Sequence, residues 1–554
     1  GKGKGKKWGK GGGKEEKESL FEKRARERKE KLSAFSSQLA THLGLNSKFN
    51  AEHYKNIIDG PYDEEEKRVE LTDKPGHLFS VKADITHLSC DTWLIPCNRS
   101  GGCQIRPIFQ MEGGRVLRRG FTNQQRCNLY FGEKQNYKDL PIPILTWTAC
   151  SIPTGELHSK VKWMMDGVKQ FIDLSLKTLK AHKRSPRNRR QRYLIALPLI
   201  NTGSGGGRSS SGAILQYLIP TLFDLVSPEL DIVLVSADDA SHAAVQSVRL
   251  RYWGLYPHFI NLSQNTQKIS QKLANFAKED SLALFLGAGV SCGAGLPTWG
   301  QLLEKLGEKG GMSKEELEVL GKMNFLDQAR IIELKLGGPL ALQTEIASHL
   351  KSEYFSIVHS LLVNLPVKGS VTTNYDILFE QASHFPFCRN SSICVLPYER
   401  RGVGKEEKER WLLKMHGCVK HPSDIVLTRS DFNRYSERRA ALAGIVQSML
   451  ITKHMLFVGF SLNDDNFHKI MDAVRAAMSL TKKSEDDGFG TSLMLNAVGM
   501  QAELWSSELE IITMQSKEDD EEEEKYTDIW DKMSCYDPEW KKKKKERKER
   551  EEKQ

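Results

Sequence analysis

Short apolar runs alternate with longer amphipathic stretches along most of the chain. In the first half, strand-like runs cover 77–84, 91–97, 143–150, 193–200 and 231–238, and helical periodicity spans 161–182 and 212–226. A second series has strand-like runs opening near residues 281, 369, 411, 454, 491 and 509. This alternation predicts α/β layers with mostly parallel sheets.

The pattern also predicts how the chain is divided. We expect two α/β domains flanked by polar ends, and disordered charged tails are expected where the sequence becomes low in complexity. The predicted divisions are a basic tail over 1–33, a helical lead-in over 34–65, a first domain over 66–262, a second over 265–514 and a charged tail over 515–554.

The net charge of +10 is concentrated in the tails. Residues 1–33 carry +7 and residues 541–554 carry +5, which leaves −2 for residues 34–540. A near-neutral body argues against specific nucleic-acid binding. The arginine-rich segment 183–192 is expected to be a solvated surface loop.

The ten cysteines are scattered, without a CxxC pair, and this excludes a zinc site built on paired CxxC motifs. Such usage predicts free thiols in an intracellular, cytoplasmic protein. No apolar stretch approaches the ~18 residues of a membrane-spanning helix, so no membrane partner is expected.

The segment SLALFLGAGVS, residues 281–291, is an apolar strand that runs directly into glycines. Gly287 and Gly289 would let the backbone approach a pyrophosphate, and Ser291 could add a hydroxyl donor. The dinucleotide fingerprint would need a third glycine where Cys292 stands. A tight turn with a purely structural role remains the alternative.

Three further polar clusters follow apolar runs, in the segments GSVTTNYD, KMHG and LFVGFSLNDD. They contribute Asn374 and Asp376, then His416, then Gly459, Ser461 and Asp464. Each cluster taken alone is typical of a turn. Since the carboxyl ends of parallel strands lie along one edge of a sheet, four such clusters predict one shared crevice.

In order, GAGVSCGAGLPTW, TTNYD, MHG and VGFSLNDDNF resemble the SIR2-like NAD-consuming domain over about residues 265–514. They resemble especially the branch found in defence-associated NADases. The resemblance implies a Rossmann-type fold that binds NAD+ as its substrate, without a metal, and cleaves the nicotinamide–ribose bond. It also implies a homo-oligomer.

The same resemblance implies roles for individual residues. Asn374 would contact the ribose or position the attacking water, Asp376 would lie near the nicotinamide, and His416 would act as general base. The implied NAD-binding set is Gly287, Ala288, Gly289, Ser291, Pro297, Trp299, Thr373, Gly459, Ser461 and Asp464. The sequence departs from the deacetylases of the family at Pro297-Thr298-Trp299 and in lacking their four-cysteine zinc module.

The first domain resembles a macrodomain, the ADP-ribose-binding fold, through VKADITH, the strand ending at Asn98 and the loop NTGSGGG. The implied ligand pocket comprises Asp84, Asn98, Thr202, Gly203, Ser204 and Gly205. Ile95 replaces the first of the family's paired asparagines, and Gly101-Gly102-Cys103-Gln104 replaces its GGGV loop. A macro-like scaffold with a closed pocket is the alternative.

Together these features predict an NAD+ glycohydrolase that releases nicotinamide and ADP-ribose, or a cyclic isomer. The macro-like domain would bind product or an ADP-ribose-type nucleotide and regulate the enzyme. The alternatives are an NAD-dependent protein ADP-ribosyltransferase or deacylase, and a non-catalytic ADP-ribose- or NAD-binding assembly protein.

Overall fold

The computed structural model describes part of the chain, namely residues 76–104, 120–132, 137, 140–153, 155–202, 210–252, 264–384, 393–400, 409–478, 488–494 and 503–513. The tails predicted over 1–33 and 515–554, and the lead-in over 34–65, lie outside the described residues. Within these described ranges, none of the helices combines the length and apolar character needed to cross a membrane.

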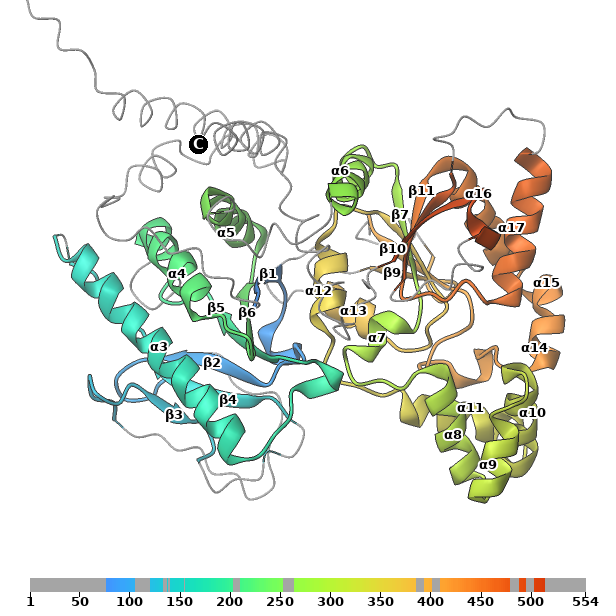
Figure 1. Cartoon of the computed structure of the whole chain (residues 1–554), viewed down its shortest axis with the longest axis horizontal. Coiled ribbons are helices and arrows are strands. Elements are labelled where there is room, and N and C mark those ends of the chain that lie inside the picture. The colour runs from blue at the N-terminus through green and yellow to red at the C-terminus, as the bar shows by residue number, and fades with distance from the viewer. Residues whose placement is uncertain are drawn as a thin grey trace, which may run out of the picture. The chain divides into compact units, whose positions relative to one another are not determined.

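The first layer, between residues 76 and 252, is built on a six-stranded sheet in the order β1-β6-β5-β2-β4-β3. Its pairs are parallel except β3 with β4. Helices α3, α4 and α5 cover one face of this sheet (Figure 1). The bounds are β1 (Leu78–Lys82), β2 (Thr92–Cys97), β3 (Cys127–Leu129), β4 (Ile142–Trp147), β5 (Tyr193–Pro198), β6 (Leu230–Ser236), α3 (Leu157–Ala181), α4 (Ser211–Leu225) and α5 (Asp239–Tyr252), with short 3-10 turns η1 (Ile85–His87) and η2 (Arg187–Arg189).

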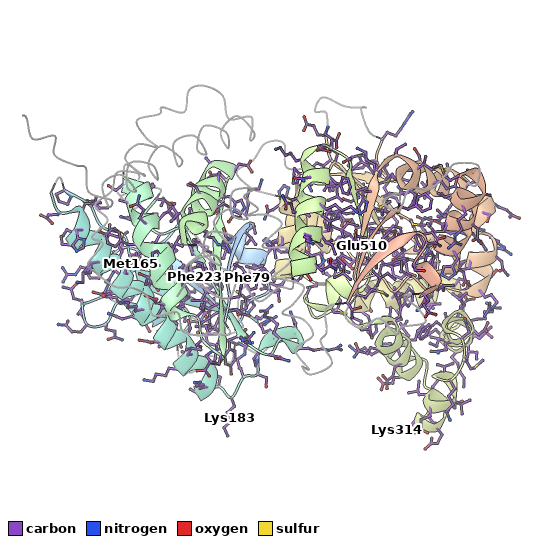
Figure 2. All side chains as sticks on the ribbon, turned by 45° about the horizontal axis from the view of Figure 1, so that its top comes forward. Phe79, Met165, Lys183, Phe223, Lys314 and Glu510 are labelled. Carbon is purple, nitrogen blue, oxygen red and sulfur yellow. The ribbon has the colours of Figure 1, made fainter. Side chains whose placement is uncertain are left out.

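Alternate residues of β1 enter two different hydrophobic cores, because successive side chains of a strand point to opposite faces. Leu78 packs in the core that also holds Met165 of α3 and Phe223 of α4 (Figure 2). Phe79 belongs instead to the core that contains Phe355 and residues of the second sheet. One continuous core therefore reaches from the first sheet into the second.

The second sheet is entirely parallel and has the order β13-β12-β11-β7-β8-β10-β9. Without the edge strand β9, this is the 3-2-1-4-5-6 order of a Rossmann-type fold, so the expected fold is confirmed. The bounds are β7 (Leu282–Leu286), β8 (Gly369–Thr372), β9 (Cys394–Leu396), β10 (Trp411–Lys414), β11 (His454–Val458), β12 (Gly490–Met494) and β13 (Leu509–Thr513).

Helices cover both faces of the second sheet. Leu284 of β7 packs in the core shared with the first layer, and its neighbour Phe285 packs in a third core on the other face. The helices are α6 (Gln264–Lys278), α7 (Gly289–Cys292), α8 (Trp299–Lys309), α9 (Lys314–Leu320), α10 (Phe325–Leu336), α11 (Pro339–His349), α12 (Ile357–Asn364), α13 (Leu378–Ser383), α14 (Arg429–Asn433), α15 (Tyr435–Arg438), α16 (Ala440–Thr452) and α17 (Asp465–Met478), with η5 (Pro422–Asp424).

The arginine-rich segment 183–192 is less solvated than expected. Arg190 is buried and forms an ion pair with Asp231 at 2.5 Å, and Arg192 is buried as well. Only part of the segment, including Arg189, is exposed. The expectation of a solvated loop is wrong for these two arginines, because each has a buried partner that the sequence pattern does not reveal. Arg190 pairs with the carboxylate of Asp231 in β6, and Arg192 donates to the carbonyl oxygen of Pro228 at 3.2 Å.

Candidate functional site

Of the four strand ends predicted to share one crevice, three are joined directly by hydrogen bonds. Asn374, which follows β8, donates from Nδ2 to the carbonyl oxygen of Gly287, which follows β7, at 2.9 Å. The amide of Gly287 donates in turn to the carbonyl oxygen of Val458 at the end of β11, also at 2.9 Å. The ends of three strands are thereby joined at one edge of the sheet.

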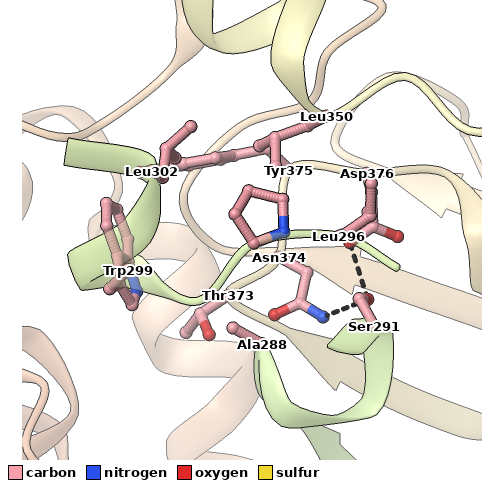
Figure 3. A pocket seen from close by; sticks show the side chains of 11 residues that line it. Ala288, Ser291, Leu296, Trp299, Leu302, Leu350, Thr373, Asn374, Tyr375 and Asp376 are labelled. Carbon is pink, nitrogen blue, oxygen red and sulfur yellow. Dashed lines mark hydrogen bonds between the residues drawn. The ribbon is translucent and has the colours of Figure 1, made fainter. Parts of the chain in front are cut away.

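Asn374, Ser291 and Asp376 form a directed chain of hydrogen bonds (Figure 3). Asn374 Nδ2 donates to Ser291 Oγ at 3.2 Å, and Ser291 Oγ donates to Asp376 Oδ2 at 2.8 Å. The hydroxyl proton of Ser291 therefore points to a carboxylate, which differs from the expected role as a donor to a phosphate. Asn374 Oδ1 is buried and has no hydrogen-bond partner within the described part of the chain.

These side chains line a pocket that is open to solvent, and the space of about 390 Å³ within it includes part of that solvent. Seven of its lining residues were predicted from the sequence: Ala288, Ser291, Pro297, Trp299, Thr373, Asn374 and Asp376. Four were not assigned a role: Leu296, Leu302, Leu350 and Tyr375. Leu296 and Tyr375 lie inside the recognised motifs, whereas nothing in the local pattern distinguishes Leu302 or Leu350 from ordinary core residues.

Both apolar and polar side chains line the pocket. The rings of Trp299 and Tyr375 meet edge to face, with centroids 5.7 Å apart. The side chains of Asn374 and Asp376 supply polar groups to the same pocket (Figure 3). Apolar walls with a few placed polar groups are typical of sites for small organic ligands.

The glycines after β7 and β11 are required by close packing of two loops. A Cβ on Gly287 would lie 2.3 Å from the carbonyl oxygen of Gly459. Gly459 has φ +59°, and a Cβ there would lie 2.5 Å from the amide nitrogen of Val290. The described geometry therefore supports the structural-turn interpretation at Gly287 and Gly459, since the backbone that comes close is the protein's own.

His416 lies at the carboxyl end of β10, as predicted, but it is 1% exposed and does not line this pocket. Its Nε2 is 3.5 Å from Asp464 Oδ2 and 3.5 Å from Asn466 Nδ2. Burial lowers the pKa of His416, and the Asp464 carboxylate opposes that shift. Gly459, Ser461 and Asp464 are likewise absent from the pocket lining.

One tyrosine connects the turn at His416 with the pocket wall. Tyr375 donates from its hydroxyl to the carbonyl oxygen of Val426 at 2.7 Å, and the amide of Val426 donates to the carbonyl oxygen of His416 at 2.9 Å. Gly417, which has φ +103°, permits the tight turn expected beside His416.

The described residues of the pocket predicted for the first domain use their polar atoms locally. Asp84 accepts from the amide and hydroxyl of Thr86 and contacts His87 Nδ1 at 3.1 Å. Burial opposes these bonds, but they outweigh it and the pKa of Asp84 lies below its ordinary value. Asn98 Oδ1 accepts from the amides of Ser100 and Gly102. Thr202 is half-buried, and Gly203, Ser204 and Gly205 lie outside the described residues.

Residues 368–505 match the family model of the SIR2-like domain. Over these residues the chain is similar to a SIR2-like domain. The match includes Asn374, Asp376 and His416, and it begins after the glycine loop at 287–291.

Part of the chain is also similar to several named proteins. A protein named NAD(+) hydrolase ThsA from Bacillus cereus (strain MSX-D12) is 28% identical over 208 residues, covering 36% of this chain and 41% of that protein. Its namesake from Enterococcus faecium is 27% identical over 209 residues, covering 37% and 42%. Defense-associated sirtuin 2 from Bacillus subtilis is 22% identical over 233 residues, covering 39% and 21%. The chain spans about two fifths of the length of the first two proteins.

Because of His359 in α12, we expect the free energy of unfolding to depend on pH. The residue is 1% exposed, its Nδ1 bonds Ser356 Oγ at 2.8 Å, and burial lowers its pKa from 6.5 to about 4. The unfolded chain therefore takes up a proton first as the pH falls through 6.5. We expect the free energy of unfolding to fall by about 3 kcal/mol between pH 7 and pH 4 because of this group.

The variant His359→Gln tests this expectation, because glutamine preserves the side-chain cap of the helix but does not titrate. Urea unfolding of both proteins at pH 7 and pH 5 gives the comparison. His454, whose pKa burial also lowers to about 4, remains in both proteins and cancels. An equal loss of stability in the two proteins would contradict the assignment to His359.

Proposed function

We propose that this SIR2-like chain is an NAD+ glycohydrolase. The observation that carries the proposal is the pocket at the carboxyl edge of the parallel sheet, in which Asn374, Ser291 and Asp376 meet. Its support from outside the chain is the likeness to proteins named NAD(+) hydrolase. Asn374 Oδ1, buried and without a partner in the described structure, fits a ribose hydroxyl as donor.

The proposed reaction breaks the bond between the ribose C1′ and the nicotinamide nitrogen, and the bonding electrons leave with nicotinamide. Because nicotinamide in NAD+ is cationic, it departs as a neutral molecule and leaves an oxocarbenium-like ribose. The Asp376 carboxylate would stabilise this positive charge, and Asn374 would hold the ribose or the attacking water. The water oxygen then bonds to C1′ and gives up a proton.

His416 is the proposed acceptor of that proton. Since burial lowers its pKa, the ring is neutral near pH 7 and able to accept one. Its position outside the pocket lining means that this role stays a prediction. The proposed diphosphate contacts at Gly287, Ala288 and Gly289 also stay predictions.

Chromatography of NAD+ incubated with the full chain tests the proposal. We expect nicotinamide and ADP-ribose in equal amounts, or nicotinamide and a cyclic isomer. Label from NAD+ appearing on protein would indicate an ADP-ribosyltransferase, and nicotinamide release only with an acyl-lysine peptide would indicate a deacylase. Binding of NAD+ without nicotinamide release would overturn the proposal in favour of a non-catalytic protein.

We also propose that the macro-like domain over 66–262 binds an ADP-ribose-type nucleotide through Asp84, Asn98 and Thr202 and regulates the enzyme. The support is the sequence resemblance at those residues. Calorimetry with ADP-ribose on the full chain should then detect a site that Asn98→Ala removes. Identical titrations for the two proteins would refute this second proposal.

A further inference from the structure

Asn188 of the first α/β layer reaches the segment that follows the glycine loop of the SIR2-like domain. Its Nδ2 donates to the carbonyl oxygen of Gly293 at 2.8 Å and to Ser89 Oγ at 2.7 Å. The residue has φ +53°, a left-handed conformation that asparagine tolerates better than most residues. One amide therefore ties the first layer to the end of helix α7.

The turn around Gly293 is fitted to this asparagine. Gly295 has φ +86°, and a Cβ added there would lie 2.7 Å from Asn188 Oδ1. The chain then runs directly into Leu296 and Pro297, which line the pocket. This part of the pocket wall thus follows directly on a turn that contacts Asn188 in η2 of the first layer.

A second contact from the first layer reaches the same helix by another route. Leu88 pairs with Phe355 in an isolated parallel bridge, in which the amide of Ser89 donates to the carbonyl oxygen of Phe355 at 2.8 Å. The next residue, Ser356, donates from Oγ to the carbonyl oxygen of Val290 in α7 at 3.4 Å. Helix α7 is consequently held near both of its ends.

We infer that Asn188 is a positioning residue for the pocket, which it shapes by holding the turn at 293–295. The first layer is then part of the scaffold of the site. Through this turn, Asn188 keeps Leu296 and Pro297 in place before a ligand enters, so the entropic cost of ordering the wall does not weaken binding. The part of this inference that concerns activity rests on the proposed NAD+ hydrolysis.

Asn188→Gly tests the inference in the full chain, because glycine keeps the left-handed backbone and removes only the amide side chain. We expect the KM for NAD+ to rise about twofold to tenfold, the effect of a lost hydrogen bond, with little change in kcat. The matched control is Arg189→Gly, since Arg189 has φ +66° and an exposed side chain in the same loop. The control should behave like the unaltered protein.

Measuring KM and kcat separately distinguishes a positioning role of Asn188 from a general loss of protein stability. A variant that is only less stable has fewer active molecules, which lowers the apparent kcat and leaves KM unchanged. An unchanged KM in Asn188→Gly would therefore overturn the inference. So would an equal rise of KM in Arg189→Gly.

Amide hydrogen exchange supplies a readout that needs no activity. The amides of 294–296 donate within the turn, and we expect them to exchange faster in Asn188→Gly than in Arg189→Gly. Equal exchange rates would overturn the inference even if NAD+ is cleaved. Failure of the unaltered chain to cleave NAD+ would refute the proposed function alone, and the exchange rates would still decide the role of Asn188.

Discussion

Asn374→Ala is expected to lower the rate of nicotinamide release by about 10²-fold to 10³-fold, the range for removing one preorganised hydrogen-bonding group from an active site. Alanine removes both the donor to Ser291 Oγ and the buried Oδ1 that faces no protein donor within the described structure. The Ser291–Asp376 hydrogen bond remains. The loss should therefore appear in kcat/KM while the fold persists.

Two further variants make this result specific. Asn374→Asp keeps the shape but sets a carboxylate oxygen against the carbonyl oxygen of Gly287, now 2.9 Å from Nδ2, so it should be nearly as inactive. Asn433→Ala, at an exposed asparagine in the same domain, should be fully active. Thermal unfolding of all three shows whether they fold. Full turnover by a folded Asn374→Ala protein would exclude Asn374 from the proposed chemistry.

The fold and the centre of the site were predictable because they depend on patterns of short range in the sequence. Apolar runs bounded by polar residues predicted most strands of both sheets, and parallel strands bring their carboxyl ends together. Asn374 and Ser291 meet for that reason, although they are far apart in the chain. The short strands β3 and β9 were missed, since three residues give too little pattern to recognise.

The rest of the site depends on packing between elements that are far apart in the sequence. Such packing leaves no pattern in the local sequence from which these residues could be predicted. Leu350 lines the pocket from the end of α11, yet its sequence context is that of any core leucine. Asn188 lies in a segment rich in arginine that predicts solvation, and only the packing of two sheets into one core reveals its contact with Gly293. Gly459 was assigned to a ligand, but the backbone that approaches it is the loop at Val290.

Lys414 is expected to contribute strongly to the stability of the fold, because its charged ammonium group is buried next to the pocket residue Asp376. The side chain is 0% exposed, its Nζ lies 3.1 Å from Glu380 Oε1, and it also donates to the carbonyl oxygen of Asp376. Lys414→Met leaves the Glu380 carboxylate without this partner. We expect the free energy of unfolding to fall by about 3–5 kcal/mol, as measured by urea unfolding at pH 7.

The pH dependence and a matched pair test the electrostatic cause. Burial raises the pKa of Glu380, and removal of Lys414 would raise it further. A carboxyl whose folded pKa exceeds its unfolded pKa favours folding at low pH and loses that contribution as the pH rises, so the variant's deficit should be larger at pH 8 than at pH 5. The exposed pair Lys368–Asp280, at 2.9 Å, is the control, and Lys368→Met should cost less than about 1 kcal/mol. If both substitutions cost the same, the loss would come from packing of the lysine stem and not from a buried charge.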